Sequence, residues 1–199
     1  MDLKPWHLTT AVSILLVAVL AGAYFITSSK RVPEEFSQAR IKGSDIAEEI
    51  LAQQAFSLKT LEEIAQHDRE NNPTEALILI ANELIKNREA NAKAIKLSSQ
   101  LEKMATNLGD IRPSKARESA TTAVASEVTL VSRLLSYNNY LAQLFEVLKL
   151  KFQSPQKYQS VQVKDLVNKI NDEVRAINEL DKRFNESLRN FDAIVLPQK

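Results

Sequence analysis

Hydrophobic and polar residues follow two different patterns along this chain of 199 residues. Residues 8–26 read LTTAVSILLVAVLAGAYFI, an apolar run without a charged residue. From residue 32 onward, apolar residues recur at every third or fourth position, which is the spacing of one face of an α-helix. The pattern therefore predicts an apolar N-terminal unit, residues 1–31, and one soluble helical domain, residues 32–199.

The apolar run has the properties of a membrane-spanning helix. Its length is close to the ~20 residues that a helix needs to cross a ~30 Å hydrocarbon core. Trp6 and Tyr24 lie near its two ends, where amphipathic aromatic side chains favour the membrane interfaces. Lys30 and Arg31 end the run. We therefore expect a single-pass signal anchor that contacts the lipid bilayer through residues 8–26.

A cleaved signal peptide is the alternative interpretation of the same segment. Lys4 then belongs to a basic N-terminal region, residues 8–20 form the hydrophobic region, and Ala21-Gly22-Ala23 is the cleavage site. The apolar run continues beyond that site through Tyr24-Phe25-Ile26, which favours an uncleaved anchor.

The side of the membrane on which the domain lies follows less directly from the sequence. Basic residues follow the run at positions 30, 31, 40 and 42, and the positive-inside rule then favours the cytoplasmic face. A short basic tail ahead of an apolar segment is also how exported anchors begin. The expectation is therefore a membrane protein with a lean toward the cytoplasmic face.

Proline positions predict the architecture of the domain. Pro33, Pro73, Pro113 and Pro155 lie at intervals of about 40 residues. Proline is tolerated in the first turn of a helix but not in its interior, so each proline is expected to open a helix. Four long helices of nearly equal length, joined by short loops, form an up-down antiparallel four-helix bundle. The predicted fold class is therefore all-α.

Local signals sharpen the predicted ends of these helices. Asn72 and Ser154 precede prolines as N-caps, and Gly109 is a natural C-terminal cap for the second helix. Gly43, followed by a serine, weakens the start of the first helix. One interpretation is therefore that the segment from Pro33 to Lys42 is a flexible or separate piece of chain next to the membrane.

Each helical pattern has polar interruptions. In the first helix, the predicted buried positions are Ala47, Leu51, Leu58, Leu61 and Ala65. The antiparallel register brings four amide side chains to one level: Gln54, Asn87, Asn138 and Asn171. Three interpretations remain open: buried amides that set helix register, a small-ligand pocket in the bundle core, or exposed residues.

Composition narrows the possible chemistry. The 26 basic and 25 acidic residues nearly cancel, which argues against a nucleic-acid partner. Cysteine is absent, only three glycines occur, and His67 is the single histidine of the domain. These residues supply no glycine-rich phosphate loop and no histidine-rich metal site. His67 is expected to be a solvated residue at the end of the first helix, and we expect no enzyme, no cofactor and no metal.

Two aromatic residues on the third helix have two interpretations. Tyr137 and Tyr140 fall just off the predicted apolar seam. They form either a strip for a protein partner or ordinary packing at the rim of the core.

Three stretches resemble the LemA family, whose members carry an N-terminal membrane segment followed by a long helical bundle. Residues 58–70, LKTLEEIAQHDRE, resemble the family's V-E-T-V-K-G-Y-A-x-H-E stretch. Residues 141–145, LAQLF, resemble L-x-x-L-F, and residues 182–191, KRFNESLRNF, resemble Q-R-Y-N-D-A-V-R-E-Y. The family's D-L-I-P-N-L-V and Y-P-D-L-K segments are missing. The resemblance implies a membrane-anchored helical protein without established catalytic residues, so it assigns no site.

Two functions remain in view from the sequence. The first is a tethered helical bundle that acts as a scaffold or accessory factor through contact with a protein partner. The second is a sensory bundle that binds a small ligand at the polar layer. A coiled-coil oligomer in which several copies share one seam is a further possibility.

Overall fold

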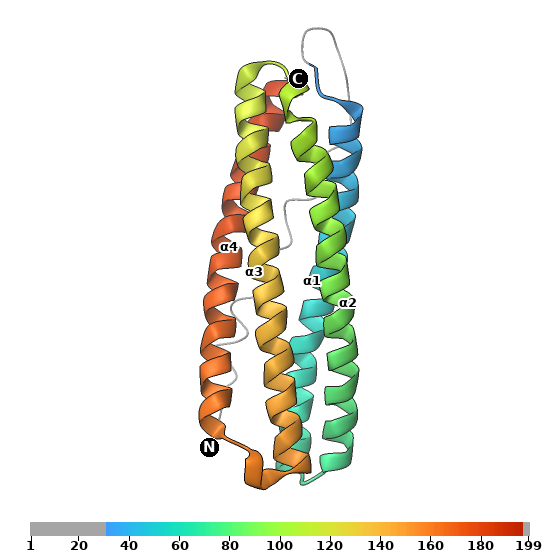
Figure 1. Cartoon of the computed structure of the whole chain (residues 1–199), viewed down its shortest axis with the longest axis vertical. Coiled ribbons are helices and arrows are strands. Elements are labelled where there is room, and N and C mark those ends of the chain that lie inside the picture. The colour runs from blue at the N-terminus through green and yellow to red at the C-terminus, as the bar shows by residue number, and fades with distance from the viewer. Residues whose placement is uncertain (1–30, 197–199) are drawn as a thin grey trace.

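The computed structural model describes residues 31–196, and these residues form four long α-helices and two short 3₁₀ turns. The α-helices are α1 (Glu34–Arg69), α2 (Pro73–Thr106), α3 (Ser114–Gln153) and α4 (Ser160–Val195). They run alternately up and down beside one another as an elongated bundle (Figure 1). The described part of the chain is all-α and has the four helices that the sequence predicts.

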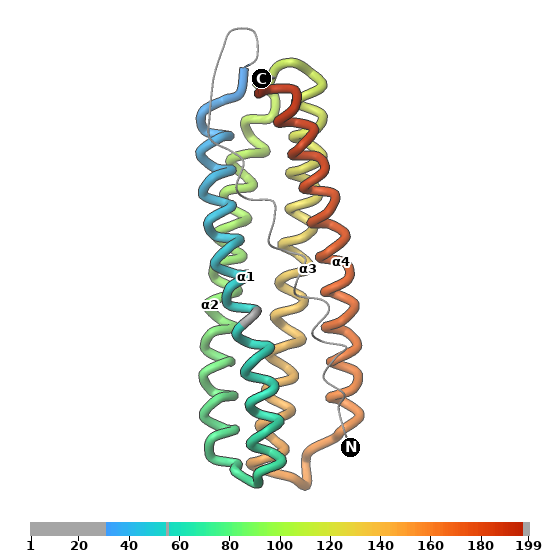
Figure 2. Tube along the Cα trace, turned by 180° about the vertical axis from the view of Figure 1, so that it is seen from behind, coloured from blue at the N-terminus to red at the C-terminus, as the bar shows by residue number. Residues whose placement is uncertain are grey.

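Consecutive helices make the closest backbone contacts: α1 with α2, α2 with α3, and α3 with α4. The backbones of α1 and α4 approach each other less closely (Figure 2). Side chains join these two helices at the end of the bundle where α1 begins and α4 ends. We call this end the α1–α4 pole. There the rings of Phe36 and Phe191 lie 5.7 Å apart between centroids.

The turn between α1 and α2 shows why the chain reverses here. Asn71 has a positive φ of 54°, a conformation that asparagine tolerates better than most residues. The N–H of Asn72 donates to the carbonyl of His67 (2.9 Å), which satisfies an end carbonyl of α1 as in a Schellman motif. The Asn72 side chain then accepts a hydrogen bond from the N–H of Glu75 (3.5 Å). The predicted cap at Asn72 and helix start at Pro73 are confirmed.

Two predicted helix ends are wrong. Pro155 opens only the 3₁₀ turn Pro155–Lys157, and α4 begins at Ser160, after Tyr158, which packs against the core. Gly109 lies inside the 3₁₀ turn Leu108–Asp110 and does not cap α2. The α2 helix ends at Thr106, where the side chain of Asn107 donates to the carbonyl of Lys103 (2.8 Å).

The start of α1 belongs to the bundle, contrary to the interpretation of Pro33 to Lys42 as a separate segment. Phe36 and Ala39 are buried in the core. Gly43 does not interrupt the helix, and it is buried against α2. A Cβ atom at Gly43 would lie 3.4 Å from a methyl carbon of Leu97, which is an ordinary van der Waals contact.

The buried face of α1 differs by one residue from the predicted face. The buried positions are Ile50, Ser57, Thr60 and Ile64, whereas the leucines at positions 51, 58 and 61 are half-buried. The sequence pattern placed the leucines on the buried face because they are the larger apolar residues. The helix instead turns two hydroxyl side chains toward α2, where they find a buried hydrogen-bond partner.

The predicted anchor, residues 8–26, lies outside the described residues. Among residues 31–196, none of the helices combines the length and the apolar character that a bilayer span requires.

Candidate functional site

The most buried charged side chain described lies between α1 and α2. Glu83 is only 1% exposed. Its carboxylate accepts hydrogen bonds from the hydroxyls of Ser57 (2.6 Å) and Thr60 (3.0 Å) on α1. Lys86, one turn along α2, donates a third bond from its ammonium (2.9 Å) and is partly exposed. Burial of this carboxylate is therefore offset by three donors, one of them charged.

Sequence reasoning missed this cluster, although a signal was present. Glu83 lies three residues after Ile80 and four before Asn87, which places it on the inward seam of α2. Because a charged residue is seldom buried, a glutamate is not expected at such a position. The signal was the pair Ser57 and Thr60 on the preceding helix, spaced three residues apart, whose hydroxyls both face a buried acceptor.

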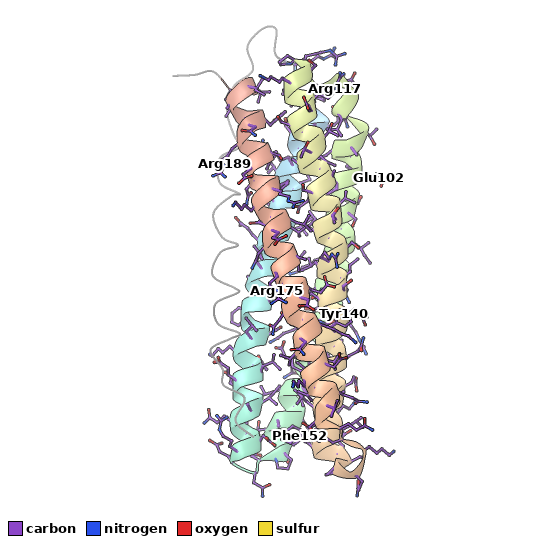
Figure 3. The ribbon with its side chains drawn as sticks, turned by 90° about the vertical axis from the view of Figure 1, so that its left-hand side faces the viewer. Glu102, Arg117, Tyr140, Phe152, Arg175 and Arg189 are labelled. Atoms are coloured by element: carbon purple, nitrogen blue, oxygen red, sulfur yellow. The ribbon has the colours of Figure 1, made fainter. Side chains whose placement is uncertain are left out.

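Tyr137 lies beside this cluster, on α3. Its side chain is buried at 5% exposure, so it is not available to a partner as the proposed strip requires. Burial raises the pKa of Tyr137 to about 12, and the charge of Glu83 contributes to the shift. Tyr140 is half-buried on the α3–α4 side, and the ammonium of Lys169 lies 5.7 Å from its ring centroid (Figure 3). The two tyrosines therefore do not form one exposed strip.

Two of the four predicted amides of the polar layer meet. The side chain of Asn87 donates to the backbone carbonyl of Asn138 (2.9 Å). The side chain of Asn138 in turn donates to the side-chain oxygen of Asn91 (3.0 Å). Asn138 is almost fully buried, and Asn91 supplies a partner for its side-chain N–H, while Asn87 supplies one for its backbone carbonyl.

The other two amides of the predicted layer do not join this network. Within the described part of the chain, no hydrogen bond connects Gln54 or Asn171 to Asn87 or Asn138. Both side chains are half-buried. The Gln54 amide nitrogen is buried without a hydrogen-bond partner among the described residues. The layer is thus a polar contact between α2 and α3 and does not extend across all four helices.

A second buried carboxylate lies between α3 and α4. Burial raises the pKa of Glu127 to about 7, and the facing Asp181 adds to this shift. Burial also raises the pKa of Asp181, whereas a hydrogen bond from Asn185 (3.0 Å) lowers it. The side-chain oxygen of Asn185 is buried and lacks a partner among the described residues. A protonated Glu127 beside Asp181 avoids placing two carboxylate charges in the same buried site.

His67 occupies the last turn of α1, as predicted, but it is half-buried rather than fully solvated. Its Nδ1 atom lies 3.6 Å from a carboxylate oxygen of Glu70. Nearby, the ammonium of Lys151 on α3 pairs with Asp68 and lies 5.8 Å from the ring of Tyr158. These contacts join the end of α1 to the α3–α4 connection.

The buried groups lie at separate levels and on separate helix pairs. Glu83 belongs to the α1–α2 contact, and Glu127 belongs to the α3–α4 contact. Within residues 31–196, no group of three or more metal-ligating side chains is close enough to hold an ion. The arrangement therefore provides helix register and one titratable buried carboxylate.

No family model matches this chain, and neither the curated proteins nor the solved structures contain a match to it. The resemblance to the LemA family therefore stays a prediction.

Proposed function

We propose that this chain is a single-pass membrane protein whose helical bundle serves as a scaffold or accessory interaction factor and performs no catalysis. Residues 8–26 are the anchor in this proposal. The protein partner contacts the helices, and the LemA-like stretches are consistent with this type of protein.

The contacts at the α1–α4 pole are the observation that supports the proposal. The carbonyl of Arg31, the first described residue, accepts a hydrogen bond from the N–H of Arg112 (2.8 Å). Four residues further into α1 than Phe36, the guanidinium of Arg40 donates to both carboxylate oxygens of Asp192 (2.7 and 2.8 Å). The same guanidinium lies 5.8 Å from the ring centroid of Phe191.

The described bundle begins a short stretch of chain after the predicted apolar run. Only residues 27–30 separate residue 26 from Arg31. The five steps from residue 26 to Arg31 span at most about 18 Å even when fully extended. An anchor that ends at residue 26 would therefore hold the pole near the membrane surface, with the helices projecting about 50 Å beyond it.

Membrane attachment is tested with charges in the apolar run. The full chain and a Leu16→Arg/Val19→Arg variant are expressed, and their membranes are washed with alkaline carbonate. Each arginine costs about 2.5–3.5 kcal/mol at the centre of a spanning helix. We expect the native chain to stay in the membrane pellet and the variant to move to the supernatant with its bundle folded. A native chain found in the supernatant would refute the anchor.

Binding of a small ligand is a second candidate, supported by a different observation. Polar side-chain atoms of Gln54, Gln100 and Asn185 are buried without hydrogen-bond partners among the described residues. Such atoms normally have a partner, and a bound molecule is one way to supply it.

Native mass spectrometry of the full chain, as purified and after unfolding and refolding, tests this second function. A bound mass that disappears on refolding, together with a lower melting temperature, would support ligand binding. Equal masses and equal melting temperatures would contradict it.

A further inference from the structure

The outward face of α2 carries an apolar pattern that the bundle does not use. The inward face already packs through residues spaced alternately three and four apart. A second set with the same spacing lies on the opposite face. Every member is exposed and all but Arg88 are apolar: Ile78, Ala81, Ile85, Arg88, Ala92 and Ile95. The three isoleucines are 48%, 55% and 64% exposed. We call this set the α2 seam.

The α2 seam differs from the matching face of another helix in the same bundle. The corresponding outward positions of α4 have the same spacing and are all exposed and charged: Asp172, Arg175, Glu179, Lys182, Glu186 and Arg189. Two of them, Arg175 and Arg189, are labelled in Figure 3. A solvent-facing helix surface is normally polar, as α4 is. An outward apolar seam with spacing of three and four is the pattern of a helix that pairs with another helix.

We propose that the α2 seam joins two copies of this chain, with the two α2 helices antiparallel. A two-fold contact uses the same patch on both copies, so the patch must complement itself. The seam meets this condition in antiparallel register: Ile78 comes opposite Ile95, Ala81 opposite Ala92, and Ile85 opposite Arg88 of the second copy. Large residues pair with large residues, and the alanines allow the backbones to approach.

Charge favours the antiparallel order over the parallel one. A parallel pair places Arg88 opposite Arg88 of the second copy, which is repulsive. The antiparallel pair instead offsets the two guanidinium groups by three residues, about 4.5 Å along the helix axis. Beyond the last isoleucine, the same face continues with Ser99 and then Glu102, so the apolar pattern ends there (Figure 3).

The contact should be weak in dilute solution. One helix face offers less area than the ~800 Å² per partner that a typical stable complex buries. Confinement to a membrane surface raises the effective concentration of a tethered partner. A covalent trap is therefore the appropriate assay.

The antiparallel order has a consequence that rests on the proposed membrane anchoring. The α1–α4 poles of the two copies point in opposite directions, about one helix length apart. The 34 residues of α2 correspond to about 50 Å. Two anchored copies paired in this way would connect two bilayers that face each other.

Cysteine trapping tests the pairing, because the chain contains no cysteine of its own. The full chain carrying both Ala81→Cys and Ala92→Cys is oxidised under mild conditions, and covalent dimers are measured by non-reducing electrophoresis. We expect the double variant to form dimers. The chain with Ala81→Cys alone should form few, because the two sulfur atoms would be separated by about 16 Å along the antiparallel helices.

A matched control uses the charged face of α4. Arg175→Cys with Glu186→Cys has the same spacing on an exposed helix and should not form dimers. Adding Ile85→Asp to the double variant should slow dimer formation about tenfold or more, because a charge replaces an apolar seam residue. Circular dichroism confirms that each variant keeps its helices.

The outcomes separate the possible partners of the seam. Rapid dimer formation by Ala81→Cys alone would refute the antiparallel register. Absence of dimers from the double variant would refute pairing with a second copy and leave the seam to a different partner. Either result leaves the membrane test of the proposed function unaffected.

Vesicles test the consequence for membranes. One vesicle population carries the full chain with Ala81→Cys, and another carries it with Ala92→Cys. Disulfide formation after mixing requires pairing between vesicles, and it supports the bridging arrangement. Dimers from the double variant without disulfides between vesicles would refute the bridging and retain the antiparallel pair.

Discussion

Replacing Glu127 with glutamine should remove a pH dependence from the stability of the bundle. Burial raises the pKa of this carboxyl from 4.5 to about 7 in the folded protein. One unit of pKa corresponds to about 1.4 kcal/mol, so the difference between folded and unfolded protein is worth about 3 kcal/mol. The Glu127→Gln variant keeps a similar shape but cannot ionise.

The sign of the effect follows from where the proton is held more tightly. Between pH 4.5 and 7, the folded protein keeps Glu127 protonated while the unfolded chain loses the proton. The folded state binds more protons in this interval, so stability falls as the pH rises. Above about pH 7, the native protein must hold a charged Glu127 beside Asp181. The variant should then be more stable than the native protein by about 3 kcal/mol, whereas the two should be similar near pH 4.

The assay is urea unfolding of the full-length native and Glu127→Gln chains at several pH values from 4 to 8, followed by circular dichroism. Comparing two full-length chains cancels whatever residues 1–30 contribute. The exposed Glu118 on the same helix provides the control, and Glu118→Gln should follow the native curve. Parallel stability curves for the native and Glu127→Gln proteins would refute the buried-carboxylate argument.

Two further predictions concern the polar contacts that join the helices. Glu83→Ala should destabilise the bundle by about 2–4 kcal/mol, because it leaves the hydroxyls of Ser57 and Thr60 without their buried acceptor. Adding Ser57→Ala and Thr60→Val to the Glu83→Ala chain should recover part of the lost free energy of unfolding, measured in urea. Strictly additive losses from the substitutions would contradict this explanation. Arg40→Ala should lower stability by about 1–2 kcal/mol by breaking the two-bond pair with Asp192, whose side chain is largely buried. Thermal unfolding of the native and Arg40→Ala chains, with and without 1 M salt, measures this pair. Equal melting temperatures of the two chains would refute its role at the pole.

Helix ends were predictable where local chemistry decides them. Asn72 and Pro73 act on the first turn of their own helix, so their effect can be read from adjacent residues. Pro155 and Gly109 suit a helix end equally well by local criteria, yet they lie in 3₁₀ turns. The chain must cross from one helix to the next at those points, and Tyr158 packs against the core two residues before α4 begins.

The candidate site was predictable only in part. The meeting of Asn87 and Asn138 follows from antiparallel helices of equal length, because this geometry sets which levels face each other. The same reasoning placed Gln54 and Asn171 at that level but could not determine which way each side chain turns. Glu83 was missed because its burial depends on hydroxyl donors from another helix.

The sequence by itself determined the helical class and the number of long helices in the described part of the chain. These properties depend on residue spacing and on local effects of proline and asparagine. Only the tertiary structure decided which face of α1 is buried, that Tyr137 lies inside, and that an apolar face of α2 is exposed among the described residues. Those outcomes depend on the partners that neighbouring helices supply, and a polar side chain is buried only where such partners satisfy it.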